Sequence, residues 1–348
     1  MHDFLKSLIE KNGPLDVGQF MALALGHPQF GYYMKQDPFG AHGDFTTAPE
    51  ISQMFGEMVA AWILDVWQQM GAPELTLLEC GPGRGTLMAD IMRSLKNVPD
   101  FHGKTNIHLM EMSPVLKAMQ GGILAAYEPQ WHANFETVPS DRPVIVIANE
   151  FLDALPVRQL VKAKSGWDER VVALSGDEFV FKTRNLPFDI SVAAKAGDIF
   201  EISPARSLFS TDIVEKMKDC GGGAALLIDY GHVESGVGDT LQALKKHEYV
   251  SPLKDVGDAD ITTHVDFFAA KQAAENAGGK VSGPVEQGEF LKKLGIGHRA
   301  ETLKIKATDA QKFDIEKALQ RLTDSSQMGS LFKVMGITYG QNLSLAGF

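Results

Sequence analysis

The sequence has few cysteines, no long apolar run and no cluster of basic residues. Only two cysteines occur among 348 residues, Cys80 and Cys220. This excludes a disulfide-stapled secreted scaffold and a cysteine-based zinc site. The ten histidines show no metal-ligand spacing, so we expect no bound metal. No apolar stretch reaches the roughly eighteen residues of a membrane helix, and the charged N-terminus does not resemble a signal peptide. We therefore expect a cytoplasmic protein without membrane insertion.

The chain as a whole is acidic and has no basic run. Asp and Glu number 44 against 33 Lys and Arg, which gives a formal net charge of −11. Nucleic-acid binding depends on basic side chains that neutralise phosphates. We therefore expect no nucleic-acid partner. The length allows a sizeable core divided between more than one structural unit, and the sequence leaves the oligomeric state open.

Short apolar runs alternate with amphipathic stretches from residue 75 onward. The runs that read as strands are 75–80, 107–112, 144–150 and 225–231. Continuous apolar strands of this length are typical of a parallel sheet covered on both faces. Alternation with helices indicates a doubly wound, Rossmann-like α/β fold. A last strand near 330–340 is expected to return to this sheet.

The rest of the chain divides into two further parts. Residues 1–70 favour helices separated by a loop-like stretch, and 157–203 shows an apolar period of two. That period indicates antiparallel strands joined by turns such as Ser165-Gly166 and Ser175-Gly176. We predict an N-terminal helical segment with a cofactor-covering loop (1–70), a core (71–156 and 204–348) and an antiparallel β insertion (157–203).

The strongest motif is a glycine-rich turn between the first core strand and a helix. It reads Glu79-Cys80-Gly81-Pro82-Gly83-Arg84-Gly85. Such a turn uses glycines for unusual backbone angles and for close approach of a ligand to the main chain. The N–H groups of the following helix then face that ligand.

The spacing of the glycines distinguishes the two ligands that use such turns, S-adenosylmethionine and a nicotinamide dinucleotide. The glycines follow G-x-G-x-G rather than G-x-G-x-x-G, and Glu79 precedes the first by two residues. An acid there suits the cationic ammonium and sulfonium of S-adenosylmethionine and would repel a pyrophosphate. We therefore predict S-adenosylmethionine, with a nicotinamide site or a turn without ligand as the alternatives.

Two further strand ends carry polar residues that suit this cofactor. Glu111 ends the second apolar run, where such folds place an acid for the ribose hydroxyls. Met112 beside it is a candidate to pack on the adenine ring, and Asn149 ends the third run as a further cofactor contact. A solvated acid at a strand end remains the alternative for Glu111.

Carboxylates follow the third run in the string Asn149-Glu150-Phe151-Leu152-Asp153. Ligands of doubly wound sheets bind beyond the carboxyl ends of the strands, so Glu150 and Asp153 are candidate catalytic residues. Two carboxylates can clamp a guanidinium, and the Pro-Pro-aromatic string typical of base-amino methyltransferases is absent. His264 is a candidate to orient a carboxylate or relay a proton. A helix-capping cluster and a surface histidine are the structural alternatives.

Several unusual strings make the chain resemble one methyltransferase family. It resembles the MidA-like S-adenosylmethionine-dependent methyltransferases, whose mitochondrial members are arginine methyltransferases acting in respiratory complex I assembly. The strings are HPQFGYY (27–33), GDFTTAPEISQMFGE (43–57), ECGPGRGTLM (79–88), ANEFLDALPVRQ (148–159), LLIDYGH (226–232) and ADITTHVDF (259–267).

The resemblance implies a class I methyltransferase core and transfer to an arginine of a protein substrate. Within the glycine-rich turn it implies that Gly81, Gly83 and Gly85, with Pro82 between them, cradle the cofactor. It also implies that Asp44, Phe45 and Thr46 belong to a segment folded over that cofactor. The functional alternative is a non-catalytic assembly factor that binds S-adenosylmethionine, since motifs alone do not carry a partner across a family.

Overall fold

The computed structural model describes residues 1–35, 47–185 and 190–348 and contains two compact units. Residues 47–152, 209–233 and 265–348 form one, which we call the sheet unit. Residues 1–35, 153–208 and 234–264 form the other, which we call the N-terminal unit. The three-part division predicted from the sequence stays a prediction, because a grouping of contacts does not test which parts fold alone.

The sheet unit is built on an eight-stranded sheet with the order β4-β3-β2-β5-β10-β16-β15, in which β14 also pairs with β10. All neighbouring strands are parallel except β16, which runs antiparallel to β10 and β15. The strands are β2 (Leu75–Cys80), β3 (Thr105–Met110), β4 (Gln130–His132), β5 (Val144–Asn149), β10 (Gly223–His232), β14 (Val265–Asp266), β15 (Lys280–Glu286) and β16 (Phe332–Tyr339). The predicted return of the last strand to the sheet is confirmed.

The strand order reverses direction at the centre of this sheet. The chain moves outward from β2 through β3 to β4 and then continues on the other side of β2 with β5 and β10. In open α/β sheets the ligand crevice lies at such a switch point, beyond the carboxyl ends of the two strands. The turns after β2 and β5 therefore define where the site lies.

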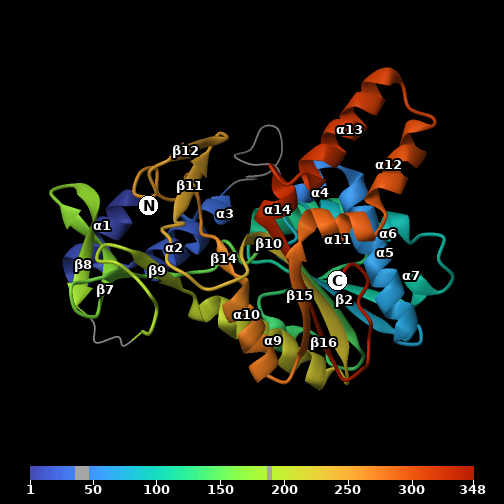
Figure 1. The fold of residues 1–348 in the computed structure, drawn as a ribbon, viewed down its shortest axis with the longest axis horizontal. Helices are drawn as coiled ribbons and strands as arrows, with labels where there is room; N and C mark the ends of the chain where they lie inside the picture. The colour runs from blue at the N-terminus through green and yellow to red at the C-terminus, as the bar shows by residue number, and fades with distance from the viewer. Residues whose placement is uncertain (36–46, 186–189) are drawn as a thin grey trace. The chain divides into compact units, whose positions relative to one another are not determined.

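Helices cover both faces of this sheet. Alternate residues of a strand point to opposite faces, and Leu77, Ile145 and Leu226 share one core with α5 and α6. On the other face, Met217 of α9 and Ala274 of α10 are buried, and Figure 1 shows these two helices together. The helices are α4 (Ala48–Ile51), α5 (Gln53–Gln69), α6 (Thr86–Ser94), α7 (Phe101–Lys104), α8 (Pro114–Ile123), α9 (Pro204–Asp219), α10 (Phe267–Asn276), α11 (Gln287–Lys293), α12 (Ile296–Lys304), α13 (Asp309–Thr323) and α14 (Met328–Leu331), with 3-10 turns η1 (Ala125–Tyr127) and η2 (Phe135–Thr137).

The N-terminal unit contains two antiparallel sheets and three helices. One sheet has the order β1-β7-β6-β9 with β8 on β7, and the other has the order β12-β11-β13. The elements are α1 (His2–Asn12), β1 (Leu15–Asp16), α2 (Val17–Gly26), α3 (Tyr32–Lys35), β6 (Arg158–Lys162), β7 (Trp167–Ser175), β8 (Glu178–Asn185), β9 (Ile199–Ile202), β11 (Gln242–Lys245), β12 (Glu248–Val250) and β13 (Asp260–Thr262). The predicted antiparallel insertion is confirmed, with Gly166 and Gly176 at positive φ in its turns.

Local sequence explains how the N-terminal unit begins. Asp16 caps α2 by accepting a hydrogen bond from the Gln19 backbone N–H, and the Gln19 side chain accepts one from the Asp16 N–H in return. Such a reciprocal cap satisfies two helix-end donors. Phe20 and Met21 on α2 are then buried with Ile261 of β13 in one core. The unit therefore combines residues far apart in the chain, a grouping that the sequence pattern did not indicate.

Candidate active site

The glycine-rich turn follows β2 in the sheet unit and leads into α6. Gly81, Gly83 and Gly85 have φ of 64°, 53° and 89°, in the left-handed region that favours glycine. The Gly81 N–H donates to the Met110 carbonyl at 3.0 Å, which ties the turn to the end of β3. A side chain at Gly81 would also meet Phe151, because an added Cβ would lie 2.6 Å from its Cδ2. The positive φ and the close approach of Phe151 together explain the glycine at position 81.

Glu79 is buried directly before this turn. Its side-chain atom Oε2 has no hydrogen-bond partner among the described residues. Burial raises the pKa of Glu79 to about 8, and a hydrogen bond from the Met88 backbone offsets only part of that rise. A buried carboxylate oxygen without a partner is costly. The geometry therefore fits a cationic ligand group that would pair with this carboxylate, as the ammonium of S-adenosylmethionine would.

We expect the affinity for S-adenosylmethionine to rise with pH between about pH 6 and pH 7.5, by up to roughly tenfold for each pH unit. Glu79 is largely protonated in this range, so a cation that pairs with its carboxylate must displace a proton. Calorimetric titration at several pH values measures this slope, and Glu79→Gln should remove it. The same slope in that variant would show that another group is responsible.

The raised pKa of Glu79 also has a consequence for folding. The folded protein keeps this proton up to about pH 8, whereas the unfolded chain releases it near the ordinary glutamate pKa of 4.5. The group therefore destabilises the ligand-free protein progressively as the pH rises through this range.

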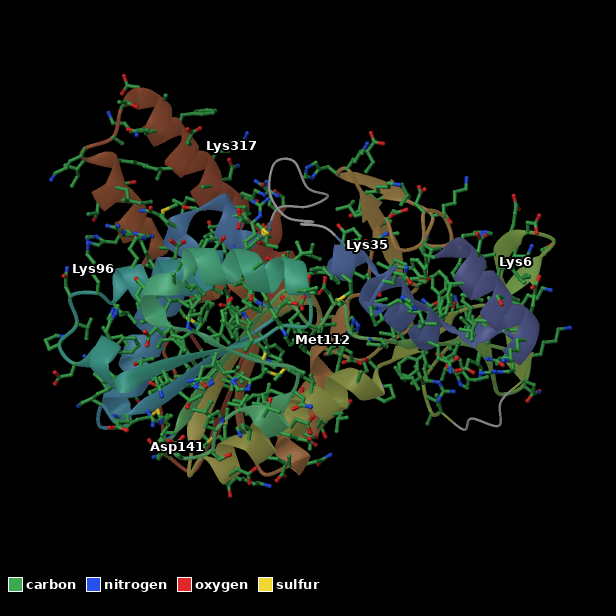
Figure 2. The ribbon with its side chains drawn as sticks, turned by 180° about the vertical axis from the view of Figure 1, so that it is seen from behind. Lys6, Lys35, Lys96, Met112, Asp141 and Lys317 are labelled. Carbon is green, nitrogen blue, oxygen red and sulfur yellow. The ribbon has the colours of Figure 1, made fainter. Side chains whose placement is uncertain are left out.

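Glu111 follows β3 and is held by a network of donors. Its Oε1 accepts hydrogen bonds from the backbone N–H groups of Met112 and Ser113 at 2.8 and 2.7 Å. Its Oε2 accepts one from Gln120 at 3.2 Å. The carboxylate is thus fixed at the carboxyl end of β3, where the sequence predicted a contact to ribose hydroxyls. Met112, labelled in Figure 2, is 63% exposed, which leaves its side chain accessible to an adenine ring.

Gln120 is a site residue that the sequence reasoning missed. Its side chain lies on α8 and is fully buried. Its Nε2 donates to the Gly83 carbonyl at 2.7 Å as well as to Glu111, so it joins the glycine-rich turn to the acid after β3. One signal was present: Gln120 interrupts the apolar stripe of Leu116 and Leu124 at helical spacing.

The turn after β5 carries Asn149 and Glu150. Glu150 has φ of 50°, a left-handed conformation that is strained for a residue with a side chain. Its Oε1 accepts hydrogen bonds from the Ala48 backbone N–H at 2.8 Å and from Asn149 Nδ2 at 3.2 Å. The buried Oδ1 of Asn149 has no partner within the described part of the chain. That oxygen is therefore available to a ligand donor.

The short helix α4 links the two turns at the switch point. Glu50 of α4 accepts a hydrogen bond from Thr86 Oγ1, and its Oε2 lies 3.6 Å from Nη1 of Arg84. Ala48, two residues earlier, donates to Glu150. We call residues 47–51 the strap, because they bind the turn after β2 at one point and the turn after β5 at another. Asp44, Phe45 and Thr46, predicted to cover the cofactor, lie outside the described residues.

Asp153 and His264 belong to the N-terminal unit, where Arg206 joins their backbones. Arg206 is 4% exposed, and its guanidinium donates to the carbonyls of His264 at 2.6 Å and Asp153 at 3.1 Å. The Thr263 N–H also donates to the Asp153 carbonyl at 3.1 Å. The structure thus brings the segments of Asp153 and His264 together, while Glu150 lies in the sheet unit. Their catalytic roles stay predictions.

The described residues contain neither a metal-binding cluster nor a membrane-crossing helix. Across 1–35, 47–185 and 190–348, no three His, Cys, Asp or Glu side chains are grouped so that they would hold a metal ion. Among the same residues, no helix combines the length and the apolar character that crossing a bilayer requires.

A family model and several relatives match this chain. The model, described as a putative S-adenosyl-L-methionine-dependent methyltransferase, matches residues 58–285. The chain belongs to this methyltransferase family, as the resemblance predicted. S-adenosylmethionine is accordingly its cofactor, and the G-x-G-x-G spacing indicated the correct ligand class.

Named relatives cover nearly the whole chain. A Drosophila melanogaster protein named protein arginine methyltransferase NDUFAF7 homolog, mitochondrial, is 32% identical over 97% of this chain and 84% of its own length. The Xenopus laevis protein of the corresponding name is 34% identical over 94% of this chain and 82% of its own. A crystal structure from Burkholderia thailandensis with bound S-adenosyl-homocysteine has a TM-score of 0.86 and 27% identity, covering 100% of this chain and 94% of that one. The class I methyltransferase fold is therefore confirmed.

The predicted cytoplasmic location is contradicted by these comparisons. The relatives from Drosophila melanogaster, Xenopus laevis and Mus musculus are each named as mitochondrial proteins. The prediction relied on low cysteine content and on the lack of a signal-peptide pattern. Both features are equally compatible with a mitochondrial protein, so they carried no information on this point.

Proposed function

We propose that this methyltransferase transfers a methyl group to an arginine side chain of a protein substrate. The names of the curated relatives support an arginine acceptor. The observation that carries the proposal within this chain is the Glu150 carboxylate, held at the carboxyl end of β5 beside the switch point. A link to respiratory complex assembly, which the family resemblance implies, is part of the same proposal.

The cofactor supplies an electrophilic methyl group on sulfur when it is bound. Glu79 would pair with its ammonium, and Glu111 would accept hydrogen bonds from its ribose. The three glycines and Pro82 would let the main chain approach it closely. Met112 would cover the adenine, and Asn149 would offer its unpartnered oxygen to a donor. Each of these residues lies in the sheet unit, at or next to the carboxyl end of β2, β3 or β5.

The acceptor requires groups that handle a proton. A guanidinium is protonated at neutral pH because its pKa exceeds about 12, so methylation of one nitrogen must release a proton. Glu150 is proposed to orient the guanidinium through charge-assisted hydrogen bonds and to accept that proton. Asp153 and His264 are proposed on the sequence as further catalytic residues, one as a second carboxylate and the other as a proton relay.

Radiolabel transfer tests this function directly. Purified protein and tritiated S-adenosylmethionine are incubated with protein extract from cells that lack this chain, and hydrolysed protein is analysed for methylarginine. We expect label in methylarginine, and roughly a hundredfold less or lower still with Glu150→Gln. Tight binding of S-adenosylmethionine and S-adenosyl-homocysteine without transfer would instead support the non-catalytic assembly factor.

A further inference from the structure

Asp229 lies within β10, one residue after Ile228, the last residue of that strand to pair with β5, and its side chain is fully buried. Its Oδ2 accepts hydrogen bonds from the backbone N–H groups of Phe151 and Leu152, at 3.1 and 2.8 Å. Its Oδ1 accepts one from the Tyr230 N–H at 2.9 Å. One carboxylate thus binds two consecutive peptide groups that directly follow Glu150.

The same turn is fixed on its other side. The Glu150 N–H donates to the Ile228 carbonyl at 2.9 Å, so β10 binds the backbone immediately before and after the Glu150 side chain. Glu150 itself has φ of 50°. A non-glycine residue keeps such a conformation only where its surroundings hold it. The neighbouring strand, through Asp229 and Ile228, supplies that restraint.

We propose that Asp229 is a positioning residue for methyl transfer, which holds the peptide groups after Glu150 so that the Glu150 carboxylate keeps its place. This inference rests on the proposed role of Glu150. Asp229 does not act on the acceptor itself, because its carboxylate is wholly buried and both of its oxygens accept backbone hydrogen bonds.

The substitution Asp229→Asn tests the proposal with little change in side-chain volume. An asparagine offers one acceptor oxygen and one NH2 group. In either orientation, the NH2 group faces backbone N–H donors, those of Phe151 and Leu152 or that of Tyr230. Displacements of about 1 Å in a catalytic group can cost on the order of a hundredfold in rate. We expect kcat to fall by about that factor while the Kd for S-adenosylmethionine stays nearly unchanged.

A double-mutant cycle with Glu150→Gln separates positioning from general damage. The readout is the initial rate of tritium transfer to the extract described above. If Asp229 acts through Glu150, adding Asp229→Asn to Glu150→Gln lowers the residual rate far less than it lowers the wild-type rate. An equal factor in both backgrounds would overturn the proposal.

Amide hydrogen exchange gives a second readout that does not depend on activity. The Phe151 and Leu152 amides should exchange faster in Asp229→Asn, while amides inside β5 stay protected. Val146→Ala is the matched control for lost packing, because it creates a small cavity at a buried position of β5, three residues before Asn149. This variant should keep both the wild-type kcat and slow exchange at the Phe151 and Leu152 amides. Unchanged exchange at Phe151 and Leu152 in Asp229→Asn contradicts the proposal.

The failure of this inference is distinguishable from failure of the proposed function. If Glu150→Gln keeps wild-type turnover, or if the wild-type protein transfers no label, the role of Glu150 fails and the inference with it. If Glu150→Gln is inactive while Asp229→Asn is fully active, Glu150 stays in the mechanism and only the role of Asp229 is rejected.

Discussion

Glu150→Gln will lower kcat for methyl transfer by roughly 10²- to 10⁴-fold, the range over which a positioned acid or base contributes. The substitution removes the negative charge that would orient a guanidinium and accept its proton. It preserves an acceptor oxygen for the Ala48 N–H, so the strap can keep its contact with this turn. The Kd for S-adenosylmethionine should therefore change little, and a single-turnover assay with calorimetry measures both quantities.

Glu248→Gln is the matched control for the loss of one negative charge, because Glu248 is an exposed residue of β12. It should leave both kcat and Kd as in the wild type. Wild-type turnover in Glu150→Gln would remove Glu150 from the mechanism. An equal loss of turnover and of cofactor affinity would show that Glu150 acts by holding the strap rather than on the acceptor.

Gly81→Ala will weaken S-adenosylmethionine binding by about a hundredfold or more, since two separate costs add. A left-handed φ of 64° costs a residue with a Cβ about 1–2 kcal/mol. The Cβ would also lie 2.6 Å from Phe151 Cδ2, so either the ring or the cofactor turn must move. Because Phe151 directly follows Glu150, kcat should fall as well. Titration calorimetry and thermal unfolding measure the effects on binding and folding.

Two other glycines separate these costs. Gly71 has a φ of 87°, and open space surrounds the position of an added Cβ. Gly71→Ala therefore carries the backbone cost alone and should leave cofactor binding intact. Gly85→Ala combines a φ of 89° with a nearest neighbour at 3.4 Å, Leu124, and should be intermediate. If Gly81→Ala binds the cofactor as tightly as Gly71→Ala does, the loss of affinity expected at Gly81 is refuted.

The sheet and its ligand-binding edge were predictable because their signals are periodic or local. The apolar run 144–150 predicted β5 to within one residue, and the glycines after Glu79 marked a turn whose backbone angles need them. Continuous apolar strands indicate burial on both faces, and that determines which strand ends can meet a ligand. The positions of Glu79, Glu111 and Glu150 at those ends followed from this reasoning.

The contacts that fix the site were not predictable in the same way. Gln120, Glu50 and Asp229 all act through hydrogen bonds to residues distant in sequence, and such bonds leave no period in the chain. They depend on which strands and helices become neighbours, and only the folded chain shows that. Two local traces were present, a polar residue within an apolar stripe at Gln120 and an acid near the end of an apolar run at Asp229, but neither indicated the bonding partner.

The hairpin of β11 and β12 shows a different reason for failure. Its two-residue turn is formed by Lys246 and His247, both at positive φ, between Lys245 and Glu248, which pair directly. Turns of this kind are recognised by Asn, Asp or Gly, and neither residue belongs to that set. No turn signal is therefore present between Lys245 and Glu248, and the three-stranded sheet of the N-terminal unit was not predicted.

The strap also sets a limit on the spacing of the chain. Ala48 and Glu50 lie two residues apart in α4, and each is bonded to a different turn at the switch point. Inserting or deleting one residue between them would rotate one contact by about 100° around the helix axis and break it. The length of this segment is therefore fixed by geometry. Engineered variants of the enzyme need to keep the spacing of two residues between Ala48 and Glu50.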